Sequence, residues 1–543
     1  MNAGPSIPAV ARAAATACGA ADAVVAGGAR YSFERLDRDR VEAAKAFSAA
    51  GVLPGDRVAI WAPNSYEWIV CLLGLQSAGG VVVPLNTRYR SAEATFILER
   101  SRARVLVTAT GFLGIDYEGM LAGHDLPHLE KTVVIGATGQ PHVPAGSGAM
   151  SWSEFLQLGH EVSDDEINGR VDAIAETDVS DLIFTSGTTG HPKGVMATHG
   201  QSIRVFTEWA EIVGLRRGDR YLLVNPMFHT FGYKAGIVAS LLAGATVVPL
   251  QAFDPAGALE TIAAENISVL PGPPTLYHSL LHHPALATTD TASLRLAVTG
   301  AAAIPVDLVR QIKEELGFET VLTAYGLTEA TGFVSATRPG DDIETIATTS
   351  GRAIDGVEVR VLGPDGCALS AGRQGEIVVR GYNVMQGYFE DPEQTGAAIR
   401  DGWLHTGDIG VLDPSGNLRI TDRLKDMFIV GGFNAYPAEI EQLVTQHPLV
   451  AQAAVIGVSD ERLGEVGVAF VVPVAGAEID EAEIVAWSRH RMANFKVPRR
   501  VMALDELPLN ASGKVLKDEL RRRFKETAGA TGEISSAADE RRS

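Results

Sequence analysis

The chain has 543 residues, and at about 150 residues per domain this length predicts roughly three to four domain-sized units. The formal net charge of −20 argues against a general nucleic-acid-binding protein, because such a protein needs a basic face. Charged residues make up 21% and hydrophobic residues 46%, which argues against a disordered chain and is typical of a globular one.

Cysteines are sparse and form no Cys-x-x-Cys pair; they are Cys18, Cys71 and Cys367. This spacing argues against a disulfide framework and a cysteine-ligated zinc site, and it favours a reducing cytoplasm. Neither apolar stretch near the start is expected to enter a membrane. Residues 7–20 lack the bulky apolar core of a signal peptide and predict an amphipathic helix, whereas the uncharged residues 68–86 are interrupted by polar residues and glycines.

The first elements expected along the chain are a hairpin at residues 22–33, with Gly27 and Gly28 in its turn, and a helix at residues 40–50. Strand-like and helical segments then alternate, which is typical of parallel sheets with helices on their faces. The alternating segments are residues 56–61, 68–78, 81–84, 91–101, 105–108, 221–225, 235–243, 246–250, 259–265, 269–270 and 296–299.

From about residue 350 the pattern changes to short strands between Gly, Pro and Asp turns, at residues 357–361, 375–380 and 417–420. These strands predict an antiparallel, barrel-like subdomain. A charged joint follows at residues 422–426. The strand–helix rhythm beyond it predicts a small α/β domain, with segments at residues 438–446, 451–458, 467–473 and 481–491.

Residues 185–194 form the strongest local motif, Thr-Ser-Gly-Thr-Thr-Gly-His-Pro-Lys-Gly, directly after an apolar strand. Its glycines let a backbone approach a ligand closely, and its hydroxyls and lysine offer donors that suit an anion. The motif is not a Walker A loop, because proline precedes Lys193 and glycine follows it. A flexible surface turn is the alternative, but the density of the motif favours a phosphate loop.

On these residues the sequence resembles the adenylate-forming superfamily of acyl-CoA synthetases, luciferases and peptide-synthetase adenylation domains, over nearly the whole chain. Further motifs stand in the family's order: Tyr-Gly-Leu-Thr-Glu at residues 325–329, Thr-Gly-Asp at 406–408, the charged joint at 422–426 and Pro-Leu-Asn-Ala-Ser-Gly-Lys at 508–514. Each motif alone is weak, whereas all of them in this order are specific.

The resemblance implies an α/β fold with two parts. A large N-terminal domain would contain two doubly wound sheets and a β-barrel-like subdomain, and a small, mobile C-terminal domain would be α+β. The expected boundaries are an AMP-binding domain at residues 1–422, a hinge at 423–427, a C-terminal domain at 428–527 and a flexible tail at 528–543. The implied reaction uses ATP, Mg²⁺ and coenzyme A: a carboxylate attacks the α-phosphorus of ATP, and a thiol then displaces AMP.

The first step brings two anions together, which repel by about 4 kcal/mol at a separation of about 4 Å near a surface. A cation between them lowers that barrier. The resemblance implies that Lys514 is this catalytic cation, and a solvated loop lysine is the alternative. It also implies that Glu329 holds Mg²⁺, with Thr185 beside it, and that Thr328 binds the α-phosphate. An ordinary helix start is the alternative for Thr328 and Glu329.

The resemblance assigns further nucleotide contacts. Tyr325 would stack on adenine, Asp408 would accept hydrogen bonds from both ribose hydroxyls, and Arg423 would reach the ribose or the phosphates. The full expected set is Thr185, Ser186, Gly187, Thr188, Thr189, Gly190, Lys193, Gly300, Ala301, Ala302, Tyr325, Gly326, Thr328, Asp408, Arg423 and Lys514.

For the second step the resemblance implies that the C-terminal domain turns about Lys425. One face of that domain would bring in Lys514, and the other would form the coenzyme A site near Gly431, Gly432 and Phe433. Plant coumarate-type ligases have a lysine where Gly431 stands, so this chain lacks one positive contact expected for coenzyme A.

An acyl pocket rich in small residues is expected from the same resemblance, with His229 as an aromatic gate beside the carboxylate; a core histidine is the alternative. Lys234 is a lone charge in an apolar run. It is expected either to reach the surface along its apolar stem or to meet a distal ketone or second carboxylate of the acid. The expected pocket residues are His229, Phe231, Gly232, Lys234, Ala301, Gly326, Ala330 and Gly332.

Residues 83–89 and 229–236 resemble actinobacterial ligases of steroid degradation, which implies that the acid is HIP, the hydroindanedione propanoate left after removal of the A and B rings. The alternatives are a medium-chain fatty or aromatic acid, a freestanding enzyme that loads a carrier protein, a luciferase-type oxygenase and a regulator that has lost catalysis. The expected partners are ATP, a small carboxylic acid and coenzyme A, without nucleic acid or a membrane span. The oligomeric state stays open, with a homodimer as one option.

Overall fold

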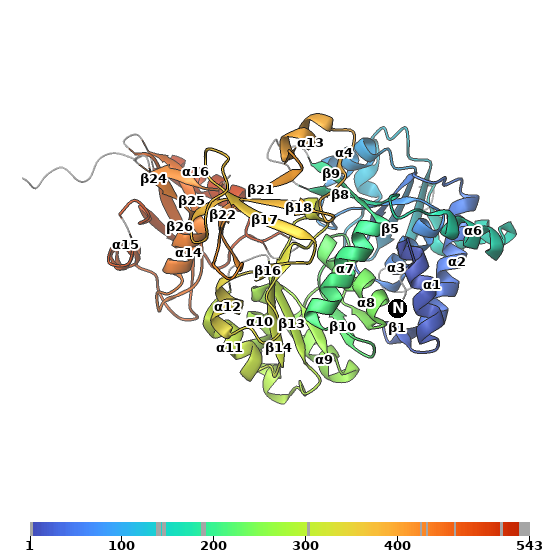
Figure 1. The fold of residues 1–543 in the computed structure, drawn as a ribbon, viewed down its shortest axis with the longest axis horizontal. Helices are drawn as coiled ribbons and strands as arrows, with labels where there is room; N and C mark the ends of the chain where they lie inside the picture. Colours follow the sequence, from blue (N-terminus) through green and yellow to red (C-terminus); the bar gives the residue numbers. More distant parts are fainter. Residues whose placement is uncertain are drawn as a thin grey trace, which may run out of the picture. The chain divides into compact units, whose positions relative to one another are not determined.

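The computed structural model describes residues 4–136, 143, 148–185, 192–300, 304–423, 426–430, 433–460, 463–492, 494–510 and 514–531 (Figure 1). The chain divides into two compact units. The first comprises Met1–Thr406 and Leu412–Arg419, and the second comprises Gly407–Val411 and Ile420–Ser543. Within the described ranges, no helix combines the length and the apolar composition needed to cross a membrane.

The first elements follow the expected order of helix, hairpin and helix. Gly27 and Gly28 close the hairpin with φ of 58° and 81°, values that glycine adopts at little cost. The second helix begins earlier than expected because the Ser32 hydroxyl caps its first turn. These elements are α1 (Ile7–Cys18), β1 (Asp22–Ala26), β2 (Ala29–Ser32) and α2 (Phe33–Ala49).

The first large sheet has eight strands in the order β19-β9-β8-β4-β3-β5-β6-β7. Its strands from β8 to β6 are parallel, as the alternating pattern predicts, whereas β9 runs antiparallel to β8 and β19 adds antiparallel to β9. The elements are β3 (Arg57–Trp61), α3 (Tyr66–Ser77), β4 (Val81–Pro84), α4 (Ser91–Ser101), β5 (Val105–Thr110), β6 (Lys131–Gly136), β7 (Met150–Ser151), β8 (Val179–Thr185), β9 (Lys193–Thr198), α7 (His199–Val213) and β19 (Gly387–Tyr388).

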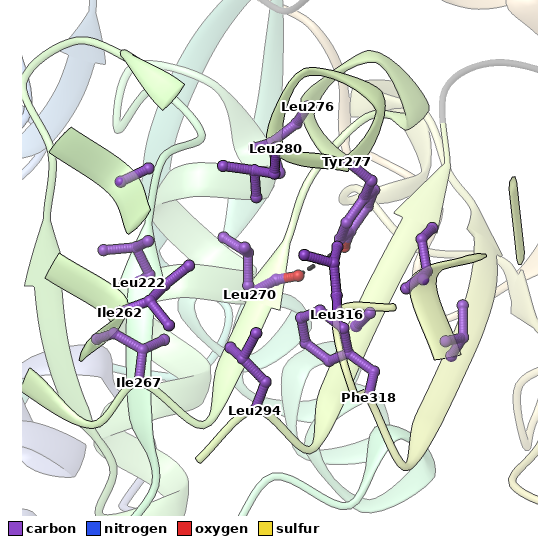
Figure 2. Close-up of a cluster of buried hydrophobic side chains, with 14 of the residues drawn as sticks. Leu222, Ile262, Ile267, Leu270, Leu276, Tyr277, Leu280, Leu294, Leu316 and Phe318 are labelled. Atoms are coloured by element: carbon purple, nitrogen blue, oxygen red, sulfur yellow. Dashed lines mark hydrogen bonds between the residues drawn. The ribbon is translucent and has the colours of Figure 1, made fainter. Parts of the chain in front are cut away.

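The second large sheet has nine strands in the order β16-β15-β14-β13-β12-β10-β11-β1-β2. Helices α9 and α10 pack on it around a buried core, shown in Figure 2, in which the Tyr277 hydroxyl donates to the carbonyl oxygen of Leu270 at 2.6 Å. The elements are β10 (Arg220–Leu223), β11 (Thr246–Pro249), α9 (Pro255–Glu265), β12 (Val269–Pro271), α10 (Pro274–Leu281), β13 (Leu296–Gly300), α11 (Val306–Glu314), β14 (Thr320–Tyr325), β15 (Ser335–Ala336) and β16 (Arg352–Ala353).

One helix differs from its prediction, at residues 235–243. The π-helix η3 (Phe231–Val238) covers the first four residues of this segment, and α8 (Ala239–Ala243) covers the rest as an α-helix. Every residue of η3 after Phe231 is buried, so the sequence has no amphipathic pattern that could locate the helix start. Gly232 lets the first turn form, because a Cβ there would lie 2.1 Å from the carbonyl oxygen of Pro226.

A smaller sheet of five strands has the order β17-β18-β21-β20, with β22 beside β21. Its pairs β17–β18 and β20–β21 are antiparallel, which confirms the short antiparallel strands expected from about residue 350. Strand β22 ends at Arg423 and therefore crosses the predicted domain boundary at residue 422. The domain boundaries stay predictions. The strands are β17 (Val357–Leu362), β18 (Gln374–Gly381), β20 (Ile399–Arg400), β21 (Trp403–Leu412) and β22 (Leu418–Arg423).

The second unit has a five-stranded sheet in the order β24-β23-β26-β25, with β27 parallel to β26. Helix α14 packs on it through Ile440, against Phe428 and Val455. This α+β arrangement agrees with the expected fold class. The elements are β23 (Phe428–Val430), β24 (Phe433–Ala435), α14 (Pro437–Val444), β25 (Val450–Asp460), β26 (Gly464–Pro473), α15 (Glu481–Arg489), β27 (Arg500–Ala503) and α16 (Lys517–Thr531).

Candidate active site

Two hydroxyls converge on the carboxylate of Glu329 in the first unit. Thr185, the last residue of β8, donates to Oε1 of Glu329 at 3.2 Å. Tyr388, in the edge strand β19, donates to the same oxygen at 3.1 Å. Burial of the phenol, together with the nearby carboxylate, raises the pKa of Tyr388, so its hydroxyl remains a donor at neutral pH. The structure thus brings Thr185 and Glu329 together, as the predicted metal site requires.

A tight turn holds Glu329 in place. Residues Thr328–Ala330 form the 3₁₀ turn η5 directly after β14, and Gly332 follows with φ of 95°. A Cβ on Gly326 would lie 2.1 Å from the carbonyl oxygen of Gly332, so the two backbone segments can approach only because residue 326 is glycine. The amide of Met385 donates to the backbone oxygen of Glu329 at 2.9 Å, which ties this turn to the segment before β19.

Lys193 lies next to this carboxylate site. It pairs with Thr185 across the β8–β9 ladder, so the phosphate-loop motif leaves and rejoins the sheet at one place. Its ammonium donates to Oε1 of Gln394 at 2.5 Å and lies 5.2 Å from the ring centre of Tyr388. The loop residues predicted to cradle the phosphates lie outside the described residues; they are Ser186, Gly187, Thr188, Thr189 and Gly190.

The carboxyl ends of β13 and β14 carry further residues that are predicted to bind the nucleotide. Gly300, at the end of β13, pairs with Ala324 of β14, and a Cβ on Gly300 would lie 2.5 Å from the carbonyl oxygen of Ala324. Tyr325 ends β14, immediately before the turn that carries Glu329. Crevices at the carboxyl ends of strands in α/β sheets are the usual place for ligands. Two predicted residues, Ala301 and Ala302, lie outside the described residues.

His229 and Thr230 lie directly before η3. The hydroxyl oxygens of Thr230 and Thr328 are 3.5 Å apart, which places this segment beside the Glu329 turn. His229 is exposed, so the alternative of a core histidine is wrong. Its Nδ1 accepts a hydrogen bond from the amide of Phe231 at 3.3 Å. Three other predicted pocket residues lie close to this segment. Ala330 is buried, a Cβ on Gly232 would meet the backbone of Pro226, and a Cβ on Gly332 would meet the side chain of Thr230.

The position of Lys234 differs from both predictions, that it reaches the surface and that it meets a group of the acid. Its side chain is 1% exposed, so it does not reach the surface, and its ammonium forms an ion pair with Oδ1 of Asp181 at 3.0 Å. The ammonium therefore faces strand β8 and not a pocket for the acid. The reason is the winding of η3, which buries every residue from Gly232 to Val238.

The second unit holds the remaining predicted groups. Asp408 is buried in β21 at 4% exposure. Lys514 and Asn510 close a turn by two bonds: the Lys514 amide donates to Oδ1 of Asn510 and the Asn510 amide donates to the Lys514 oxygen, each at 2.8 Å. Arg423 and Phe433 are strand residues of β22 and β24. Lys425, Gly431 and Gly432 lie outside the described residues.

The donors around Glu329 fit a magnesium ion bound together with a nucleotide. Among the described residues no group of three or more His, Cys, Asp or Glu side chains could hold a metal by itself. Magnesium characteristically takes one or two carboxylates and completes its shell with waters and substrate phosphates. Glu329 with the Thr185 hydroxyl matches that pattern.

Tyr388 and Gln394 contact predicted site residues but were not foreseen from the sequence. Tyr388 contacts Glu329 and Gln394 contacts Lys193. Both lie far along the chain from β9, and the pairing of β19 with the edge of β9 brings them to this site. A two-residue strand carries too little pattern to predict such a pairing.

Residues 10–389 match the family of AMP-binding enzymes, and residues 439–514 match the AMP-binding enzyme C-terminal domain. Two similar curated relatives are each called 3-[(3aS,4S,7aS)-7a-methyl-1,5-dioxo-octahydro-1H-inden-4-yl]propanoyl:CoA ligase. The protein of Mycobacterium tuberculosis is 51% identical over 92% of this chain and 95% of its own length. The protein of Rhodococcus jostii is 49% identical over 95% of this chain and 98% of its own length.

Solved structures agree with this likeness. The anthranilate CoA ligase AuaEII in complex with anthranoyl-AMP has a TM-score of 0.85 at 26% identity, over 96% of this chain and 98% of its own. ATP-bound MatB from Rhodopseudomonas palustris has a TM-score of 0.84 at 30% identity, over 96% of this chain and 99% of its own.

Proposed function

This chain belongs to the family of AMP-binding enzymes, and from that membership we propose that it is an ATP-dependent acyl-CoA ligase whose acid is the steroid-derived propanoate HIP. One observation carries the choice of acid. Two relatives that are 51% and 49% identical over more than nine-tenths of this chain are both named as ligases of that propanoate.

The chemistry proceeds in two steps. The acid carboxylate attacks the α-phosphorus of ATP, forming a bond to phosphorus while the bond to pyrophosphate breaks. The coenzyme A sulfur then attacks the acyl carbon, and AMP leaves. Glu329 and Thr185 would hold Mg²⁺, which neutralises phosphate charge when it is bound. Lys514 would lie between carboxylate and phosphate in the first step, where it offsets their repulsion.

We assign the remaining predicted residues by the same resemblance. Tyr325, Gly326 and Gly300 would lie against adenine, Asp408 and Arg423 would hold the ribose, and Lys193 would approach the phosphates. His229, Phe231 and Gly232 would border the acid, together with Ala301, Ala330 and Gly332. Lys425 would be the hinge, and Gly431, Gly432 and Phe433 would approach coenzyme A. The contacts of Thr185, Lys193 and Glu329 support the phosphate side of this assignment.

We propose a cytoplasmic setting, in which ATP and coenzyme A are available as co-substrates. The described cysteines fit a reducing compartment: Cys18 and Cys71 are buried free thiols, and Cys367 is an exposed one.

Turnover across a panel of acids tests the proposal. The protein is incubated with ATP, Mg²⁺, coenzyme A and HIP, cyclic keto-acids, C6 to C16 fatty acids or cinnamates, and AMP and acyl-CoA are measured. We expect kcat/KM for HIP to exceed that of every other acid by about tenfold or more, equivalent to about 1.4 kcal/mol. A higher value for a fatty acid or a cinnamate would overturn the choice of HIP.

The same panel distinguishes a CoA ligase from a carrier-loading enzyme and from a regulator without catalysis. Pyrophosphate exchange without acyl-CoA formation would identify an enzyme that loads a carrier protein. Absence of exchange with every acid would contradict catalysis and favour a nucleotide-binding regulator.

A further inference from the structure

A buried ion pair connects two elements that lead to the active site. The ammonium of Lys234, in the π-helix η3, lies 3.0 Å from Oδ1 of Asp181 in strand β8, and each side chain is 1% exposed. In the described part of the chain, Asp181 is the only carboxylate that pairs with this ammonium. A charge removed from water in this way needs a compensating partner.

Polar contacts also hold Asp181 and join the two elements that carry the pair. The Ser180 hydroxyl donates to Oδ2 of Asp181 at 2.6 Å. The Gln76 amide donates to the Ser180 carbonyl oxygen at 3.0 Å and lies 2.9 Å from the Tyr233 hydroxyl. Burial, together with the charge of Lys234, lowers the pKa of His199 to about 3, so this imidazole stays neutral and adds no second charge. Ser180 therefore supports the carboxylate of the pair, and Gln76 connects β8 to Tyr233, the neighbour of Lys234 in η3.

The pair is part of a continuous chain of contacts that passes through the candidate active site. From Asp181, strand β8 leads to Thr185, whose hydroxyl contacts Glu329. Glu329 follows Thr328, whose hydroxyl lies 3.5 Å from that of Thr230. From Thr230, the helix η3 leads back to Lys234. A displacement of η3 along β8 would thus move Thr230 and His229 relative to Glu329.

We propose that Lys234 and Asp181 form a positioning pair, which fixes the π-helical winding of η3 and thereby sets where His229 and Thr230 stand beside the acid. Rewinding η3 as an α-helix would change the residues per turn and rotate its side chains. A buried contact between one residue of η3 and one residue of β8 opposes that rotation. The proposal rests on the proposed function, which places His229 beside the acid; Thr230 follows His229 and contacts Thr328.

Stability alone does not account for the pair. Replacing a buried ion pair by apolar residues of similar volume is often neutral or stabilising, whereas removal of one partner is strongly destabilising. The best-attested use of buried polar pairs is to fix register. π-Helical turns also occur frequently at functional sites.

The test compares two double variants with the wild type. Lys234→Met/Asp181→Leu approximates the length and branching of both side chains but removes the polar contact, and Lys234→Gln/Asp181→Asn keeps a hydrogen bond without charge. Urea unfolding reports stability, hydrogen exchange reports the winding of residues 231–238, and pyrophosphate exchange reports adenylation with the acid that the wild type uses best.

We expect the apolar pair to unfold at about the urea concentration of the wild type. Its amides in η3 should exchange faster, and its KM for the acid should rise about tenfold with the KM for ATP unchanged. The hydrogen-bonding pair should restore most of the acid KM. Tyr277→Phe is the control, because it loses a buried hydrogen bond in the other large sheet and should leave the acid KM unchanged.

If the Lys234→Met/Asp181→Leu variant shows the hydrogen exchange of the wild type in η3 and the wild-type KM for the acid, the proposal is overturned. If the apolar pair does not fold, the hydrogen-bonding pair decides. An acid KM and a winding of η3 that match the wild type keep the proposal, whereas equal increases in the KM for the acid and the KM for ATP overturn it. Because the assay uses whichever acid the wild type activates, rejection of HIP as substrate leaves this test intact.

Discussion

At the scale of single residues, the carboxylate of Glu329 collects the contacts that the site depends on, because Thr185 and Tyr388 donate to one of its oxygens. Glutamine offers an oxygen to the same two donors but carries no charge, so Glu329→Gln should fold like the wild type. Loss of the charge should lower pyrophosphate exchange by about 100-fold and raise the Mg²⁺ concentration needed for half-maximal rate. A titration of the exchange rate with Mg²⁺ measures both effects.

Tyr388→Phe is the matched control for that substitution. It removes one hydrogen bond to the carboxylate and keeps the charge, so we expect a loss of no more than about tenfold, with a smaller change in Mg²⁺ requirement. A Glu329→Gln variant that keeps the wild-type rate and Mg²⁺ dependence would remove Glu329 from the metal site.

Buried His199 makes stability depend on pH. Its pKa is lowered to about 3 in the folded chain from the ordinary value of 6.5. Between these values the unfolded chain binds a proton that the folded chain does not, so stability is complete above pH 6.5 and falls as the pH decreases. The loss should reach about 2 kcal/mol at pH 5.

His199→Asn tests this dependence. The asparagine oxygen can accept the hydrogen bond that His199 Nδ1 now accepts from the amide of Ile7. Urea unfolding at pH 7 and pH 5 should show a smaller loss of stability for this variant than for the wild type. His160→Asn, at an exposed position, should leave the loss unchanged. An equal loss in His199→Asn and the wild type would show that other groups cause the acid sensitivity.

At the scale of elements, the turn after η5 depends on a glycine that can be tested against a matched position. Gly332 and Gly340 both have φ of 95°, so alanine strains the backbone equally at each. A Cβ on Gly332 would lie 2.2 Å from Cγ2 of Thr230, whereas no atom lies within 4 Å of one on Gly340. Only the first substitution should therefore move Thr230.

We expect Gly332→Ala to lower pyrophosphate exchange by about tenfold or more, since misplacement of a positioning segment is costly. Gly340→Ala should cost about 1 kcal/mol of stability and leave the rate unchanged. Equal effects of the two substitutions on the rate would show that backbone strain, and not the contact with Thr230, determines activity.

The elements also show which parts of the fold a sequence can predict. The parallel strands β3, β4 and β5 each contain a short apolar run, and the hairpin at Gly27 and Gly28 has a turn dipeptide, so local patterns identify them. The π-helix η3 and the edge strand β19 have no such pattern. The first is buried on all sides, and the second is a two-residue segment whose pairing depends on tertiary structure.

The candidate site likewise contains residues that the sequence predicts and residues that it does not predict. The motif residues Thr185 and Glu329 are predicted from the sequence, and the structure brings them together. Lys234 is assigned to the pocket by its sequence because a lone charge in an apolar run suggests a ligand contact. Its partner Asp181 lies on another strand, and no local pattern connects the two residues.

At the scale of the whole molecule, the net charge of −20 has the wrong sign to attract the proposed substrates, all of which are anions. By the proposed assignment local groups provide the attraction, and Lys193 lies in the first unit and Lys514 in the second. The proposed reaction therefore uses a group of the second unit during adenylation, and by the family resemblance Lys425 is the hinge of that unit.

A substitution at the proposed hinge tests this requirement. Hinges absorb large backbone changes in a few residues, and proline restricts φ to about −65°. Lys425→Pro should therefore keep pyrophosphate exchange within about threefold of the wild type but slow acyl-CoA formation by about 100-fold. Lys514→Ala should give the opposite pattern, with a large loss of exchange and a small loss when the acyl-adenylate is supplied. The two half-reactions are measured separately for both variants. If Lys425→Pro slows both half-reactions equally, residue 425 is not the hinge.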